Sequence, residues 1–183
     1  MPIIFSRMKN HSPTKKIIAI TGLMGVGKTT IGSKLAKKLQ YYFIDCDQEI
    51  EDREHKSIKE IFAQNGEKYF RGVEKEVIQA ITSRDEEIVL SLGGGAFMDD
   101  EARKILREKA LTIWFHAPIE KILQRIGNKN TRPLLDQKDK RIILEDLAKQ
   151  RYPIYAEADL KFDTNNENHD AIIAKIIETI NAK

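Results

Sequence analysis

The chain has 183 residues, a length that fits one domain whose hydrophobic core can fold without disulfides or metals. Its 31 lysines and arginines nearly balance 28 aspartates and glutamates, and a net charge of +3 does not support a nucleic-acid-binding surface. The sequence has no run of 18 apolar residues, so no membrane-spanning helix is predicted. A single cysteine, Cys46, excludes an internal disulfide, and we expect a cytoplasmic protein.

Short β-branched runs alternate with longer stretches of helical periodicity along most of the chain. We expect a flexible tail over residues 1–15 and one domain over 16–183. The runs expected to form strands are 17–21, 41–45, 87–92, 111–117 and 160–164. The expected helices are 29–40, 57–84 with a break at Asn65-Gly66, one from Asp99, one from Pro118, and one spanning Ile172 to Ile180. This alternation predicts an α/β domain with a parallel sheet between helical layers.

The stretch GLMGVGKTT, residues 22–30, matches the phosphate-loop pattern G-x-x-x-x-G-K-[ST] between a predicted strand and a predicted helix. Its glycines allow a tight turn whose N–H groups point at phosphate oxygens, and the following helix adds partial positive charge. Lys28 supplies a cation for the β- and γ-phosphates, and the Thr29 hydroxyl can ligate Mg²⁺. The stretch predicts a nucleoside triphosphate site but does not identify the phosphoryl acceptor.

Two carboxylates and three glycines follow predicted strands, where ligands of open α/β sheets gather. Asp45 and Asp47 could serve Mg²⁺-bound water and accept a hydrogen bond from a substrate hydroxyl. The alternative is that they cap a helix starting near Gln48. Gly93–Gly95 lack Cβ atoms, so a ligand can approach their backbone, although a simple structural turn remains the alternative.

Three arginines are candidates for binding anions, although each could also be a solvated surface charge. Arg71 is expected on the buried face of a helix, where it needs either Glu74 at i+3 or a ligand carboxylate. Arg132 lies in the polar stretch 127–140, expected as a surface loop or lid, where a cation could close over a transferring phosphoryl group. Arg151 is expected just after a helix.

In chain order, the stretches GLMGVGKTT, IDCDQEIEDR, SIKEIFAQNGEKYFRGVE, VLSLGGGA, RPLL, QRYPIY and FDTN resemble the shikimate kinase family, from about residue 17 to about residue 166. Many kinases share the phosphate loop, whereas the combination of D-x-D, F-R-x-x-E, G-G-G, R-P-L-L and R-x-P-x-Y is far more specific. The resemblance implies a three-layer α/β/α P-loop kinase of the nucleoside-monophosphate-kinase type. It also implies a five-stranded parallel sheet in the order 2-3-1-4-5, a lid and a substrate-binding helical region.

The activity that the resemblance implies is transfer of the γ-phosphoryl group of ATP to the 3-hydroxyl of shikimate, in chorismate and aromatic amino-acid biosynthesis. ATP and Mg²⁺ would be the cofactors, with Thr29 on the metal and Asp45 supporting it through water. Arg125 falls on a position that stacks near adenine, and Asn165 lies near a second adenine-side segment. The implied nucleotide-binding residues are Gly25, Val26, Gly27, Lys28, Thr29, Thr30, Arg125, Arg132 and Asn165.

The implied catalytic residues are Lys28, Asp47 and Arg132. Asp47 would hold the ring hydroxyls and orient or deprotonate the 3-hydroxyl. The substrate carboxylate would meet two arginines, with a glutamate in the same site, while the central glycine would contact the substrate through its backbone. The implied substrate-binding residues are Asp47, Arg71, Glu74, Gly93, Gly94, Gly95 and Arg151.

Two other function classes were weighed against this interpretation. A related P-loop kinase of another hydroxyl-bearing metabolite, of the gluconate type, is disfavoured because a substrate without a carboxylate leaves Arg71 and Arg151 without a purpose. A non-catalytic nucleotide-binding module is disfavoured by the intact Lys28 and Thr29. Where the family has Thr-Gly, this chain has Glu54-His55, and we expect that turn to be shaped differently. We expect a monomer that binds ATP and shikimate, with no nucleic-acid or membrane partner.

Overall fold

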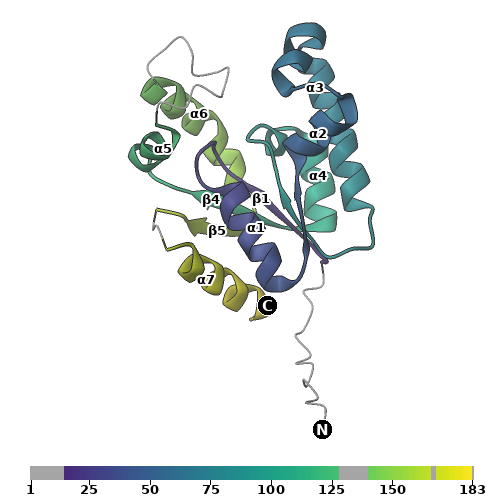
Figure 1. Ribbon diagram of the computed structural model, residues 1–183. Coiled ribbons are helices and arrows are strands. Elements are labelled where there is room, and N and C mark those ends of the chain that lie inside the picture. Colours follow the sequence, from purple (N-terminus) through teal and green to yellow (C-terminus); the bar gives the residue numbers. More distant parts are fainter. Residues whose placement is uncertain (1–14, 128–139, 166–167, 183) are drawn as a thin grey trace.

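The computed structural model describes residues 15–127, 140–165 and 168–182 (Figure 1). Almost all of the predicted tail lies outside the described residues. Arg132 and most of the predicted lid (127–140) also lie outside them, so both remain predictions.

Strands and helices alternate along the described chain (Figure 1). The strands are β1 (Ile17–Thr21), β2 (Tyr42–Asp45), β3 (Ile88–Ser91), β4 (Ala110–His116) and β5 (Leu160–Asp163). The helices are α1 (Lys28–Leu39), α2 (Cys46–Glu54), α3 (Ile58–Thr82), the 3₁₀ turn η1 (Ala96–Met98), α4 (Asp100–Lys109), α5 (Ile119–Ile126), α6 (Lys140–Tyr155) and α7 (His169–Asn181). Each predicted strand is found within two residues of its expected bounds.

The five described strands form one parallel sheet in the order β2-β3-β1-β4-β5, which confirms the predicted order. The central strand β1 is buried along its whole length, and its Ile18 lies opposite Val89 of β3 and Leu111 of β4. Strands buried on both faces are almost continuously apolar, and in IIAIT only Thr21 is polar. Because all strands run the same way, their carboxyl ends meet at one edge of the sheet, where the candidate site residues follow.

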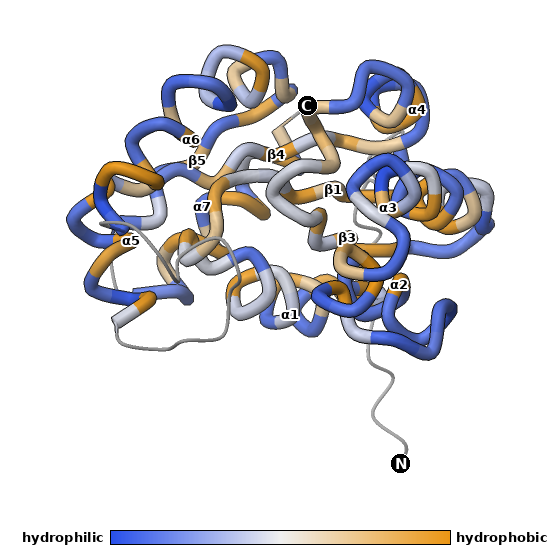
Figure 2. The backbone as a smooth tube through the Cα atoms, turned by 90° about the horizontal axis from the view of Figure 1, so that it is seen from above, coloured by the Kyte–Doolittle hydropathy of each residue, from blue (hydrophilic) through white to orange (hydrophobic). Residues whose placement is uncertain are grey.

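Helices cover both faces of the sheet. Figure 2 shows α1 and α7 on one side of the strands and α3, α4 and α6 on the other. Figure 1 shows α2 with the first half of α3 on one side of the carboxyl edge, and α5 with α6 on the other. The arrangement is the three-layer α/β/α architecture that the sequence predicted, with two helical groups flanking the edge that carries the site.

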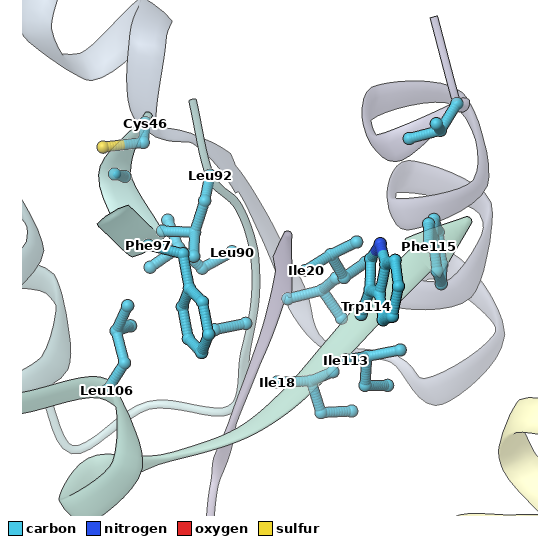
Figure 3. Close-up of a cluster of buried hydrophobic side chains, with 14 of the residues drawn as sticks. Ile18, Ile20, Cys46, Leu90, Leu92, Phe97, Leu106, Ile113, Trp114 and Phe115 are labelled. Carbon is cyan, nitrogen blue, oxygen red and sulfur yellow. The ribbon is translucent and has the colours of Figure 1, made fainter. Parts of the chain in front are cut away.

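The hydrophobic core lies on both sides of β1 (Figure 3). On one side Phe97 of η1 and Leu106 of α4 gather near Leu90 of β3, and on the other Phe115 and Trp114 of β4 are buried. Burying a large apolar side chain contributes about 1.5–3 kcal/mol, so this core anchors the strand ends that hold the site. No helix in the described ranges is long and apolar enough to cross a membrane.

Helix α3 carries several candidate residues and bends once. It starts with a capping box, in which the Ser57 hydroxyl accepts from the Glu60 N–H at 3.3 Å and Glu60 accepts from the Ser57 N–H at 2.8 Å. Gly66 interrupts it with φ 79° and ψ 173°, a conformation open almost only to glycine. The break predicted at Asn65-Gly66 is therefore confirmed, because two helical segments of α3 meet there at a kink, and the second segment carries Phe70 to Thr82 along the core.

Two predicted helix boundaries were wrong. Helix α2 begins at Cys46 rather than near Gln48, because the Asp45 side chain caps it by accepting from the Asp47 N–H at 3.1 Å. Arg151 lies inside α6 rather than after it, since that helix continues through Pro153 to Tyr155. A proline in the last turn removes only one backbone hydrogen bond, and packing of the last turn against the core holds the helix together.

His55 ends α2 in the left-handed conformation, with φ 53° and ψ 34°, and its side chain is exposed. A left-handed conformation at this position is common where glycine ends a helix, and it strains a residue that has a Cβ. The Glu54-His55 departure thus keeps a tight helix end, at a steric cost.

Replacing His55 with glycine is expected to raise the free energy of unfolding by about 0.5–1 kcal/mol, because the strain disappears. Urea denaturation of the native chain and the His55→Gly variant measures the difference. The matched control is Ser83→Gly at the end of α3, where φ is −92° and the hydroxyl donates to the Gln79 carbonyl at 2.8 Å, so glycine should destabilise. A His55→Gly variant no more stable than the native chain would contradict the strain argument.

Candidate functional site

The phosphate loop connects the end of β1 to the start of α1. Gly25 has φ 78° and Gly27, the N-cap of α1, has φ 98°, a region that favours glycine. The first turn of α1 holds no acidic residue. The partial positive charge at the start of α1 therefore faces no competing carboxylate from its own helix and remains available to an anion.

The polar side chains around this loop are already placed for phosphate and metal chemistry. The Lys28 ammonium donates to the carbonyl oxygens of Gly22 at 2.8 Å and Leu23 at 3.0 Å, so it lies across the loop. The Thr29 hydroxyl donates to Asp45 Oδ2 at 2.8 Å, while Asp45 Oδ1 caps α2. The helix-cap role of Asp45 is confirmed, and its second oxygen, which lies beside Thr29, leaves the metal role as a prediction.

A cavity of about 470 Å³ lies over the phosphate loop and contains most of the predicted nucleotide side. Its described lining residues are Gly25, Gly27, Lys28, Thr29, Thr30, Asp45, Asp47, Ser91, Leu92, Gly93, Gly94, Arg125 and His169. Backbone amides, one ammonium and one guanidinium in a concave site suit a polyphosphate ligand.

The segment after β5 is tied to the phosphate loop through Val26. The Val26 carbonyl accepts from the Thr164 hydroxyl at 2.8 Å and from the Arg125 guanidinium at 3.4 Å. Arg125 also donates to the Thr164 carbonyl. Arg125 therefore lines the cavity over the phosphate loop, and its position near adenine stays a prediction. Asn165 is exposed and is not among the described residues that line this cavity, so its assignment stays a prediction.

His169 lines the nucleotide cavity but was missed from the sequence. It is the first residue of α7, whose N-cap Asn168 accepts from the Ala171 N–H at 3.1 Å. The signal was available, because an Asn cap soon after a strand places the next residue at the carboxyl edge of the sheet. The long polar stretch between β5 and α7 hid that boundary.

A second cavity, of about 670 Å³, lies between α2, α3, α6 and the triple glycine. It contains every residue predicted to bind the phosphoryl acceptor. Its described lining residues are Met24, Thr29, Asp45, Asp47, Gln48, Glu51, Ser57, Ile58, Lys59, Phe62, Phe70, Arg71, Glu74, Gly93, Gly94, Gly95 and Arg151. Two guanidiniums, carboxylates and two phenyl rings in one cavity suit a small ring compound that carries a carboxylate and hydroxyls.

The two cavities adjoin. Thr29, Asp45, Asp47, Gly93 and Gly94 line both of them. A group bound against the phosphate loop and a group bound between the arginines would therefore meet beside Asp47. This junction is the geometry that group transfer between two bound ligands requires.

Each glycine of the triple lets one part of the acceptor site approach the backbone. A Cβ on Gly93 would lie 2.6 Å from Asp47 Oδ1, and one on Gly94 would lie 2.9 Å from Arg151 Nη1. A Cβ on Gly95 would lie 2.4 Å from Arg71 Nη2. A side chain at any of the three positions would displace a charged group of the cavity from its present place.

Arg71 and Glu74 form the most buried ion pair around this cavity. Arg71 Nη1 lies 2.6 Å from Glu74 Oε2, and Arg71 Nη2 lies 3.3 Å from Glu67 Oε1. The Glu74 side chain is 3 % exposed, and its Oε1 has no hydrogen-bond partner among the described residues. Burial raises the pKa of Glu74 to about 7, Arg71 opposes the rise, and the charge of Asp47 adds to it. The predicted pairing of Arg71 with Glu74 is confirmed, and because Arg71 also lines the cavity, its contact with a ligand carboxylate stays a prediction.

The raised pKa of Glu74 predicts a pH-dependent loss of stability. When the pKa of a carboxyl is higher in the folded than in the unfolded state, the protonated carboxyl does not destabilise the fold. As rising pH ionises it, the free energy of unfolding falls. Relative to a Glu74→Gln variant, the free energy of unfolding of the native chain should fall by up to about 3 kcal/mol between pH 5 and pH 8. Urea denaturation across this range measures the difference.

The matched control for this experiment is Glu67→Gln, because Glu67 contacts the same arginine but its side chain is 68 % exposed. We expect no comparable pH-dependent difference between that variant and the native chain. Parallel stability curves for the native chain and Glu74→Gln would show that the Glu74 carboxyl does not titrate in this window.

Known proteins resemble this chain in sequence and in structure. The family model described as shikimate kinase matches residues 24–181. A shikimate kinase of Zymomonas mobilis is 45% identical over 166 residues, covering 91% of this chain and 94% of that protein. A shikimate kinase of Novosphingobium aromaticivorans is 40% identical, covering 89% of this chain and 86% of that protein.

Solved structures of similar fold point to the same family. A shikimate kinase from Acinetobacter baumannii in complex with shikimate superimposes with a TM-score of 0.88 at 36% identity, over 93% of this chain and 96% of that one. A gluconokinase from Sinorhizobium meliloti has a TM-score of 0.55 at 16% identity over 92% of this chain and 95% of that one, which shows a shared fold alone. From its fold, its paired cavities and these matches, the chain belongs to the shikimate kinase family.

Proposed function

We propose that this chain transfers the γ-phosphoryl group of ATP to the 3-hydroxyl of shikimate, giving shikimate 3-phosphate and ADP. The single observation that carries the proposal is the junction of the two cavities at Asp47, with a phosphate loop on one side and a pair of arginines on the other. The similarity to a shikimate kinase solved with shikimate supports the choice of acceptor. The fold alone does not identify the molecule that accepts the phosphoryl group.

On the donor side, residues of the phosphate loop bind ATP, and Lys28 compensates the charge of the β- and γ-phosphates. Arg125 and His169 lie at the nucleotide cavity, where they would contact the nucleoside end. Arg132, outside the described residues, would bring a further cation to the transferring group. Val26, Thr30 and Asn165 complete the proposed nucleotide-binding set.

Mg²⁺ fits the residues present at this site. The Thr29 hydroxyl and the Asp45 carboxylate lie 2.8 Å apart beside the phosphate loop, and both are the hard oxygen donors that Mg²⁺ prefers. No cluster of three or more His, Cys, Asp or Glu suited to a metal occurs within the described residues, in keeping with an ion held mainly by phosphates and water. Mg²⁺ would neutralise phosphate charge, with Thr29 as a direct ligand and Asp45 acting through water.

On the acceptor side, Arg71 and Arg151 would bind the carboxylate of shikimate, and Glu74 would keep Arg71 oriented. Gly93 and Gly95 shape the turn, while Gly94 offers its backbone to the substrate. Asp47 would accept a hydrogen bond from the 3-hydroxyl and take its proton as the new bond to phosphorus forms. Positioning and charge neutralisation, rather than covalent catalysis, supply the rate.

We further propose that the chain works as a cytoplasmic monomer on two small molecules, without a nucleic-acid or membrane partner. The nearly balanced charge of 31 basic and 28 acidic residues supports the absence of a nucleic-acid partner. The only cysteine, Cys46, is buried, and burial raises its pKa well above the usual value, in keeping with a packing role.

Replacing Arg71 with alanine should lower kcat/KM for shikimate by about 10- to 100-fold, because a charge-assisted bond to the substrate is lost. The KM for ATP should change little. A coupled assay of shikimate-dependent ADP formation measures both constants. In the same assay, Asp47→Asn should lower kcat. The control is Arg84→Ala, since Arg84 is an exposed residue that pairs with Glu49 and lines neither cavity.

The same assay with gluconate in place of shikimate tests the rival acceptor. Turnover of gluconate without turnover of shikimate would overturn the proposed function. Full activity of both Arg71→Ala and Asp47→Asn would leave the family membership intact but overturn the residue assignments.

A further inference from the structure

Tyr155 is fully buried at the end of α6, yet the proposed mechanism gives it no role. A buried hydroxyl needs a hydrogen-bond partner, because an unsatisfied one costs about 1–3 kcal/mol. The Tyr155 hydroxyl donates to the carbonyl oxygen of Gly94, 61 residues earlier in the chain. The partner is therefore the central residue of the triple glycine.

This bond fixes the one glycine carbonyl that the local turn leaves unheld. The Gly93 carbonyl accepts from the Ala96 N–H at 3.1 Å, and the Gly95 carbonyl accepts from the Met98 N–H at 3.0 Å. The Gly94 carbonyl takes its hydrogen from Tyr155 instead. Because C=O and N–H point in opposite directions across a trans peptide, holding the Gly94 oxygen also sets the direction of the Gly95 N–H.

The same hydroxyl lies near Arg151, because a Cβ placed on Gly94 would lie 2.9 Å from Arg151 Nη1 and 3.8 Å from the Tyr155 hydroxyl oxygen. The two residues are four apart on α6, so they lie on one face of the helix. Burial raises the pKa of Tyr155, whereas the nearby positive charge of Arg151 opposes the rise. Since Arg151 Nη1 would lie only 2.9 Å from a Cβ on Gly94, the guanidinium, the hydroxyl and the glycine form one contact group.

The ring of Tyr155 is held as well. Its centroid lies 6.1 Å from the Trp114 ring and 6.5 Å from the Tyr152 ring. Aromatic packing at this spacing favours a single ring orientation. The hydroxyl is thereby fixed at the back of the acceptor cavity, behind two groups that line it.

We propose that Tyr155 is a positioning residue for the phosphoryl acceptor. Its hydroxyl donates to the Gly94 carbonyl and lies beside the Arg151 guanidinium, so that the arginine and the glycine backbone keep one relative placement. Tyr155 does not itself line the cavity and acts only through these two residues. This inference rests on the proposed function, in which Arg151 and Gly94 bind shikimate.

Tyr155→Phe tests the proposal, because it removes the hydroxyl and keeps the ring. We expect the KM for shikimate to rise about tenfold, which matches the loss of one hydrogen bond in a charged network, while the KM for ATP stays within twofold. Thermal melting and titration calorimetry with shikimate accompany the kinetics. The matched control is Tyr152→Phe, a neighbouring tyrosine whose ring packs on Trp114 and His116, and its KM for shikimate should not change.

A second variant shows whether Tyr155 acts through the arginine. If it does, Arg151→Lys and Tyr155→Phe together should raise the KM for shikimate by clearly less than the product of the two separate effects. A product of independent effects would overturn the proposal. The proposal would also be overturned if the melting temperature of Tyr155→Phe fell while the KM for shikimate stayed the same. Equal changes in the KM for shikimate and the KM for ATP would overturn it too, because either result indicates a purely structural role.

The failure of this inference differs from a failure of the proposed function. Were the native chain to show no shikimate-dependent ADP formation, the proposed function would fall and this inference with it. Normal native activity together with an unchanged KM in Tyr155→Phe would overturn the role of Tyr155 alone.

Discussion

The acceptor side depends on one steric constraint, the absence of three consecutive Cβ atoms after β3. Charged groups from three helices meet over Gly93–Gly95: Asp47 from α2, Arg71 from α3 and Arg151 from α6. Each lies so close to the backbone that a Cβ on the glycine beneath it would displace it. The parallel sheet explains why these groups meet, because the segment that follows each strand begins at the same edge of the sheet. The glycines thus serve the packing of charged residues as much as the approach of a ligand.

Close packing of charges also prepares the cavity for an anion. Arg71 is oriented by Glu74 and Glu67 before any ligand is present, so little side-chain entropy remains to be lost on binding. The same packing strains Glu74, whose burial outweighs its contact with Arg71 and raises its pKa to about 7. In this respect the proposed anion site is one that the fold tolerates at some cost in stability.

Much of this arrangement could be predicted from the sequence, and the reasons differ by feature. The strand order followed from the family resemblance, and the strand positions from short β-branched runs that have few other uses. Arg151 was misplaced because Pro153 normally marks a helix end, whereas here packing of α6 on the core outweighs one lost hydrogen bond. His169 was missed because the polar stretch after β5 hid the start of α7. Tyr155 is part of the R-x-P-x-Y motif, but it received no role because its partner Gly94 lies 61 residues away in the chain.

The position of Trp114 gives the chain a built-in optical probe. It is the only tryptophan in the sequence, and its ring lies 5.2 Å from Tyr152 and 6.1 Å from Tyr155, with the Lys161 ammonium 4.4 Å from its centroid. Indole emission depends on the polarity and charge around the ring. The intrinsic fluorescence of the protein therefore comes from a single reporter behind the acceptor cavity, and it can follow the last turn of α6 in solution without any added dye.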